Sequence, residues 1–145
     1  MMKHVFAAVS AVALFFAVAG CGNVDLTPPG PGEHVVEGVV TLPMAGSLPE
    51  NTEVTVQVAD LSRGVGRGEV LGEQTIANPG KPPVPFRIYY RAEDAVLRRG
   101  LNLDVRVSIG GKLAYYTASA HPLTSANVNE THLVEAVPVA RGGRQ

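Results

Sequence analysis

The residues of this chain that could take part in chemistry are scattered, and they assemble no catalytic set. Gly64-Val65-Gly66-Arg67-Gly68 superficially resembles a dinucleotide loop, but the β-rich run after it favours a hairpin loop. The adjacent pair Glu93-Asp94 would point its carboxylates apart on a helical turn. His34, His121 and His132 lack ligand spacing, so we expect ordinary strand-end or surface histidines. We therefore predict no enzymatic activity, no cofactor and no metal.

Cys21 is the one residue whose setting indicates a chemical modification. It is the single cysteine among 145 residues, so it cannot close a disulfide within the chain or build a zinc site by itself. A short basic start, the apolar run Val5–Phe16 and then small residues precede it, which is the order of a signal peptide. This run is shorter than the roughly 20 apolar residues of a spanning helix. The stretch Val18-Ala19-Gly20-Cys21 resembles the bacterial lipobox, whose cysteine receives a diacylglyceryl group and becomes residue one after cleavage. An ordinary secretory signal is the alternative.

Lipid on Cys21 would hold the mature chain on a membrane surface. Each buried methylene contributes about 0.8 kcal/mol, so two or more acyl chains give stable anchoring. In enterobacterial lipoproteins an aspartate directly after the cysteine favours the inner membrane, whereas Gly22 in that position favours the outer membrane. The expected organisation is a signal peptide over 1–20, a lipidated Pro/Gly-rich tether over 21–34, one periplasm-facing domain over 35–139 and a flexible tail over 140–145.

The charges are balanced overall but unevenly distributed along the chain. With 12 Lys+Arg against 13 Asp+Glu, the composition argues against nucleic acid as a partner. The segment from Cys21 to Ser62 contains acidic residues and no lysine or arginine, and every basic residue of the mature chain follows from Arg63 onward. We expect complementary cross-strand pairs between the two parts, with a polarised binding surface as the alternative.

The periodicity of the predicted domain is two, which indicates strands. Leu101–Ile109 alternates apolar and polar residues strictly, as in a strand with one face on a core and one in water. Only Ala92–Arg99 has a helical pattern. Six further β-rich runs, bounded by prolines and glycines, are Val35–Leu42, Glu53–Val58, Val70–Ile76, Pro85–Tyr90, Leu113–Ser119 and His132–Val137. About seven mainly antiparallel strands predict an all-β fold, a single small β-sandwich.

Gly110-Gly111 predicts a two-residue hairpin turn after the alternating run. With that turn Tyr116 enters the core and Tyr115 faces outward beside Arg106, whereas a three-residue turn reverses the two tyrosines. Tyrosine and arginine are enriched in binding hot spots, so Tyr115 and Arg106 form the predicted partner surface.

An ordered set of sequence blocks spans nearly the whole predicted domain. The blocks are Val35–Thr41, Val54–Arg63, Gly72–Ile76, Val84–Tyr90, Val105–Leu113 and His121–Thr124. In this order they resemble the YbaY-type lipoproteins and the related YscW-like pilotin lipoproteins of type III secretion. The resemblance implies a lipid-anchored, β-rich protein facing the periplasm, and its pilotin members help an outer-membrane secretin to reach and assemble in its membrane.

Two functions follow as expectations. The first is a non-enzymatic interaction or assembly protein, like a pilotin, whose partners are the membrane and an outer-membrane protein such as a secretin. The alternative is a β-sandwich lipoprotein of the envelope that binds a small ligand or a glycan.

Overall fold

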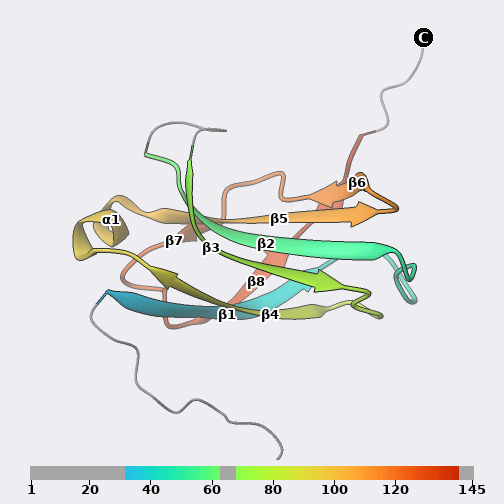
Figure 1. The fold of residues 1–145 in the computed structure, drawn as a ribbon, viewed down its shortest axis with the longest axis horizontal. Helices are drawn as coiled ribbons and strands as arrows, with labels where there is room; N and C mark the ends of the chain where they lie inside the picture. Colours follow the sequence, from blue (N-terminus) through green and yellow to red (C-terminus); the bar gives the residue numbers. More distant parts are fainter. Residues whose placement is uncertain (1–31, 63–67, 141–145) are drawn as a thin grey trace, which may run out of the picture.

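The structure, a computed structural model, describes residues 32–62 and 68–140. These residues form nine strands and one short helix, arranged as two layers of β-sheet (Figure 1). The predicted all-β sandwich is therefore confirmed. Cys21 with the stretch before it, most of the expected tether, all of the Gly64–Gly68 loop but its last residue, and the last five residues lie outside the described residues.

The two sheets differ in size. The three-stranded sheet has the order β4 (Val84–Arg91), β1 (Glu33–Thr41), β8 (Thr131–Glu135). The six-stranded sheet has the order β3 (Glu69–Ala77), β2 (Thr52–Asp60), β5 (Leu101–Ile109), β6 (Lys112–Tyr116), β9 (Val137–Pro138), with β7 (Pro122–Leu123) also paired to β5. The β1–β8 pair is parallel and the others are antiparallel.

Each of the seven predicted runs contains a strand, and the last run divides between the two layers. Its first part is β8, which pairs with β1, and its last residue belongs to β9, which pairs with β6. Ala136 lies between them and donates its backbone N–H to the carbonyl of Thr41 at 3.0 Å. The chain thus crosses from one sheet to the other at this edge of the sandwich.

The core lies between the sheets and is built from the alternating apolar residues. Val105 and Val107 are fully buried, whereas Arg106 between them is exposed. Burying a valine or leucine contributes about 1.5–3 kcal/mol, so this stripe fixes which face of β5 points inward. The helix α1 (Asp94–Arg99) closes one end with Leu97 buried, and its acidic first turn and basic last turn complement its dipole.

Two glycines allow strands to approach closely. A Cβ at Gly38 in β1 would lie 2.2 Å from the backbone oxygen of His132 in β8. A Cβ at Gly72 in β3 would lie 2.7 Å from the backbone oxygen of Tyr89, where the edge of one sheet meets the edge of the other. Only glycine fits at such approaches without a backbone shift.

Ion pairs join the acidic N-terminal part of the domain to the basic part that follows it. Arg87 pairs with Glu37, and Arg91 lies 2.5 Å from Glu33, directly across the β1–β4 ladder in both cases. The expected cross-strand complementarity is confirmed. The pairs are exposed, and ion pairs in this setting contribute little to stability.

The hairpin between β5 and β6 corrects one prediction. The two-residue turn is confirmed, since Ile109 pairs with Lys112, but a bulge follows between Val107 and Ser108. The bulge places Tyr115 opposite Val107, on the inner face, where it packs partly buried against the core. The prediction that Tyr115 faces outward is therefore wrong, because one extra residue reverses which face each later side chain occupies.

Candidate functional site

The described residues contain neither a metal centre nor a membrane span. No three or more His, Cys, Asp or Glu side chains come together there in a group that could hold a metal ion. Within the same residues, no helix is both long and apolar enough to cross a membrane. Cys21, the predicted lipidation residue, and the motif residues Val18, Ala19 and Gly20 lie outside the described residues. The candidate sites of the described domain are two surfaces.

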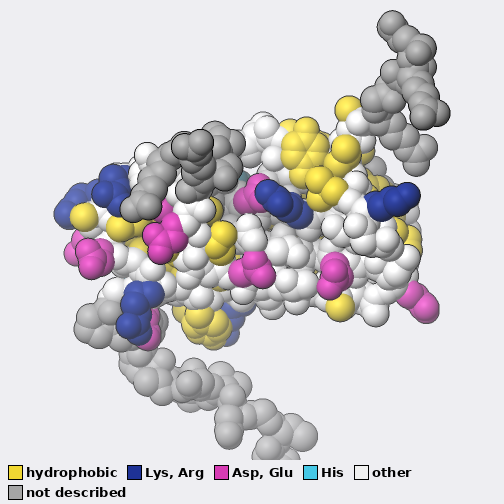
Figure 2. All heavy atoms as spheres, turned by 45° about the horizontal axis from the view of Figure 1, so that its top comes forward, with side chains coloured by type: hydrophobic (Ala, Val, Ile, Leu, Met, Phe, Trp, Pro, Cys, Tyr) yellow, Lys and Arg dark blue, Asp and Glu magenta, His cyan; other side chains and the backbone are white. Residues whose placement is uncertain are grey.

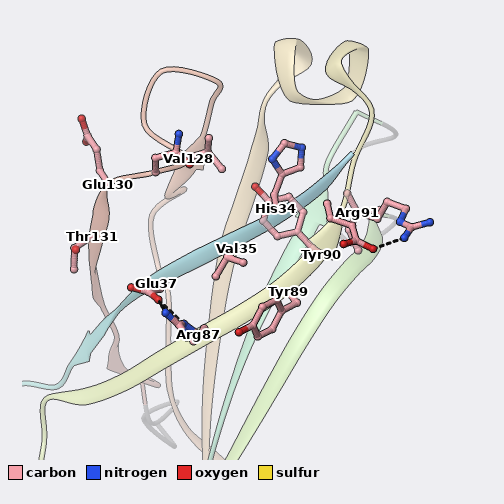
Figure 3. Close-up of a pocket in the computed structure, with 13 residues that line it drawn as sticks. His34, Val35, Glu37, Arg87, Tyr89, Tyr90, Arg91, Val128, Glu130 and Thr131 are labelled. Carbon is pink, nitrogen blue, oxygen red and sulfur yellow. Dashed lines mark hydrogen bonds and ion pairs between the residues drawn. The ribbon is translucent and has the colours of Figure 1, made fainter. Parts of the chain in front are cut away.

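An open groove lies between the N-terminal half of β1 and the segment that leads into β8, with a volume of about 960 Å³ (Figure 3). Its floor and ends come from β1 and β4, and its second wall is Val128–Thr131. Val35 and Tyr89 lie opposite each other across the β1–β4 ladder, and Tyr89 is 66% exposed. The centre of the groove is thus apolar and aromatic.

Ion pairs stand at both ends of this apolar centre. Arg87 and Glu37 close one end, and Arg91 and Glu33 the other (Figure 3). The hydrogen bond and the charge of Glu37 raise the pKa of Arg87 above its ordinary value, so this guanidinium stays charged throughout the physiological range. The backbone N–H of Arg87 is held from the other side by the side-chain oxygen of Gln74 at 2.8 Å.

Two rings lie beneath the groove on the inner side. His34 and Tyr90 have ring centroids 5.4 Å apart, and Nε2 of His34 donates a hydrogen bond to the backbone oxygen of Ala92 at 3.2 Å. Burial raises the pKa of Tyr90 to about 12. Its hydroxyl is buried and finds no hydrogen-bond partner within the described part of the chain.

A histidine pair supports the segment that forms the second wall. Nε2 of His132 lies 3.0 Å from the backbone oxygen of Asn127, an atom that only accepts, so Nε2 carries the proton and Nδ1 is free to accept. Nε2 of His121 then donates to Nδ1 of His132 at 3.0 Å. His132 lies at the start of β8 and is buried, so of the expected strand-end or surface positions it occupies a strand end.

A second candidate surface lies over β6 and β9. Leu113, Tyr116 and Val139 are exposed there, and Figure 2 shows apolar side chains gathered over this end of the six-stranded sheet. Tyr116 lies opposite Arg106, whose Nε is 3.3 Å from a carboxylate oxygen of Asp104. Of the two predicted partner-surface residues, Arg106 is exposed and Tyr115 is not.

Sequence reasoning missed both the groove and the histidine pair. The Tyr89-Tyr90 pair was the available signal, since alternation puts one ring outside and one inside. The second wall offers no such signal, because its place depends on the long connection from β7 to β8. His121 and His132 are brought together by that same connection.

The fold of the described domain is similar to that of a solved structure. The chain superposes on a solved structure described as an alternative pilotin from the type II secretion system of Vibrio cholerae, with a TM-score of 0.66 and 21% sequence identity. The match covers 75% of this chain and 99% of that chain. At this identity the likeness establishes the fold alone. In a search of curated proteins, no sequence matches the chain.

The family follows from the sequence match. Residues 32–134 match the family described as the type III secretion system lipoprotein chaperone, YscW. This range includes both walls of the groove, the histidine pair and the β5–β6 hairpin. The chain belongs to this family.

Proposed function

We propose that the chain is a lipid-anchored envelope chaperone that binds an outer-membrane secretin and promotes its assembly, in the manner of a pilotin. The observation that carries the proposal is membership of the lipoprotein chaperone family over residues 32–134. The pilotin fold of the described domain supports it. The role is non-enzymatic, in keeping with surfaces that offer grooves and apolar patches for a partner.

In this proposal Cys21 carries the lipid after removal of residues 1–20, and residues 21–34 tether the domain over 35–139 to the outer membrane, facing the periplasm. A chain held by two or more acyl chains remains on its membrane. The partner would therefore be carried to, or retained at, that same surface.

The test compares cells that make the parent chain, no chain, or the Cys21→Ser variant. We expect secretin multimers in the outer membrane to be lost without the chain and not restored by Cys21→Ser, which should take up no labelled palmitate and fractionate away from membranes. A tagged parent chain should recover the secretin from solubilised envelopes. Unchanged secretin multimers in cells without the chain would overturn the proposal.

A further inference from the structure

Strand β1 is covered along only part of one edge. On one side it pairs with β4 from Glu33 to Val40, but on the other it pairs with β8 only from Glu37 to Thr41. Within the described residues no strand lies beside the N-terminal half of β1 on that second edge. The groove occupies this place, between the β1 edge and the segment Val128–Thr131 (Figure 3).

The hydrogen-bond pattern shows which backbone groups face the groove. Ala92 donates its N–H to the oxygen of Gly32 just before β1. Because hydrogen-bonded and non-bonded residues alternate along an antiparallel ladder, the even-numbered residues of β1 form the backbone hydrogen bonds to β4. Odd-numbered residues direct their N–H and C=O toward β8, as the bond from Ala136 to Thr41 shows.

Val35 is therefore an edge residue with both backbone groups directed into the groove. If the parallel β1–β8 ladder continued to Val35, the backbone N–H of Glu130 would donate to the oxygen of Val35. That N–H instead donates to the backbone oxygen of Asn127 at 3.0 Å, within a turn. Neither backbone group of Val35 has a partner among the described residues. Open donors and acceptors on a strand edge are a template for another strand.

We propose that this groove binds an extended peptide segment of a partner protein, which adds as a short strand beside Val35. The inference rests on the proposed function, in that it identifies how the partner is held. A helix satisfies its own backbone groups and would leave those of Val35 unpaired, whereas a strand supplies both hydrogen bonds. At about 3.3 Å per residue, the edge beside Val35 that β8 does not cover accommodates a short segment of a few residues.

The side chains around the edge define the chemistry of the segment. Val35 and the exposed Tyr89 offer an apolar surface to one face of the added strand. Glu130 on the opposite wall is exposed and forms none of the salt bridges found among the described residues. The segment that fits carries an apolar residue over Tyr89 and a lysine or arginine toward Glu130.

The test uses a phage library of random 12-residue peptides selected on the purified chain, with enriched peptides synthesised and their affinities measured. Val35→Pro removes the groove-facing N–H but none of the bonds to β4, and proline is tolerated at edge positions whose N–H faces away from the sheet. Its matched control, Val35→Ala, keeps the N–H and shortens the side chain. We expect Val35→Pro to weaken binding about tenfold or more, and Val35→Ala to weaken it less than about threefold.

Amide hydrogen exchange on the unaltered chain gives a second readout that does not depend on folding of a variant. The Val35 amide should exchange rapidly in the free chain and slow at least about tenfold when a selected peptide is bound, as for an amide that gains a hydrogen bond. Equal affinity of Val35→Pro and parent, with no protection of Val35, would overturn the proposal and indicate docking through side chains, as by a helix.

Failure to enrich any peptide would also count against the inference. The proposed function would fail separately, by unchanged secretin multimers in cells that lack the chain.

Discussion

Nε2 of His121 and Nδ1 of His132 lie 3.0 Å apart and share one hydrogen. The rings meet edge to face with centroids 5.2 Å apart, and His132 is 5% exposed. The pair joins the connection after β6 to the inner face of β8 and so supports the segment that lines the groove. Because Nε2 of His121 already carries the shared hydrogen, acid adds the second proton of this ring at its Nδ1.

Acidification is expected to destabilise the domain through His121. Burial, and then the neighbouring His132, lower the pKa of His121 below its ordinary 6.5. Because the unfolded chain takes up this proton at a higher pH than the folded chain does, the free energy of unfolding falls as pH drops below 6.5 toward the folded pKa. One proton gives a slope of at most about 1.4 kcal/mol per pH unit. Urea unfolding at several pH values between about 7.5 and 5.5 measures this change in the free energy of unfolding. The range lies above the pH at which ordinary carboxylates titrate.

His121→Gln should flatten this pH dependence, and His34→Gln is the matched control that should retain it. An equal loss of stability on acidification in His121→Gln and the parent would assign the effect to another group.

Gly38→Ala is expected to disrupt the β1–β8 pair. The new methyl group would lie 2.2 Å from the backbone oxygen of His132 and 2.8 Å from the ring of Phe86. Relieving these contacts would require a shift of the backbone of His132 and of the ring of Phe86. The free energy of unfolding should therefore fall by about 3 kcal/mol or more, at the upper end of the range for overpacked cores. Thermal melting measures the change. Val39→Ala, on the opposite face of the same strand, should cost about 1 kcal/mol or less, and an equal cost for the two variants would contradict the close approach.

Tyr90→Phe is expected to leave the domain at least as stable as the parent. The Tyr90 hydroxyl is buried without a partner among the described residues, so the parent already bears the cost of removing it from water. Removing an unsatisfied buried polar group is neutral or stabilising by about 1 kcal/mol. A clear decrease in melting temperature would show that the hydroxyl has a partner, such as an ordered water.

The features predicted from sequence are those encoded locally. The alternation of Leu101–Ile109 decides which face of the strand is buried, whatever the strand pairs with. Side chains at every second residue share a face, and burial of the apolar face contributes the largest favourable free energy. The glycine pair likewise predicts its own turn, and the Ile109–Lys112 pairing follows from it.

The features that sequence could not predict depend on pairing between distant segments. The bulge beside Val107 has no sequence signal of its own, yet it exchanges the positions of Tyr115 and Tyr116. The groove exists because β8 reaches β1 only from Glu37 onward. Strands as short as β7 and β9 carry too few residues to show a period.

The exchange of the two tyrosines changes the prediction for the second candidate surface. Tyr115 is opposite the fully buried Val107 and packs against the core, whereas Tyr116 is 39% exposed and lies opposite Arg106. We therefore retain Arg106 as part of a proposed partner surface and replace Tyr115 with Tyr116. Tyrosine and arginine together are the residue types that most often carry binding energy.

Tyr115→Ala should lower the free energy of unfolding by about 2 kcal/mol, somewhat less than the 3–5 kcal/mol of a fully buried aromatic residue. Tyr116→Ala should change it by about 1 kcal/mol or less, as expected of a surface position. If the surface over β6 and β9 contributes to partner binding, Tyr116→Ala also reduces recovery of the secretin by the tagged chain while melting stays that of the parent. The reverse ranking of the two melting temperatures would show that the bulge is absent and that the register runs without interruption from the turn. Unchanged recovery with Tyr116→Ala would leave the groove beside Val35 as the surface that holds the partner.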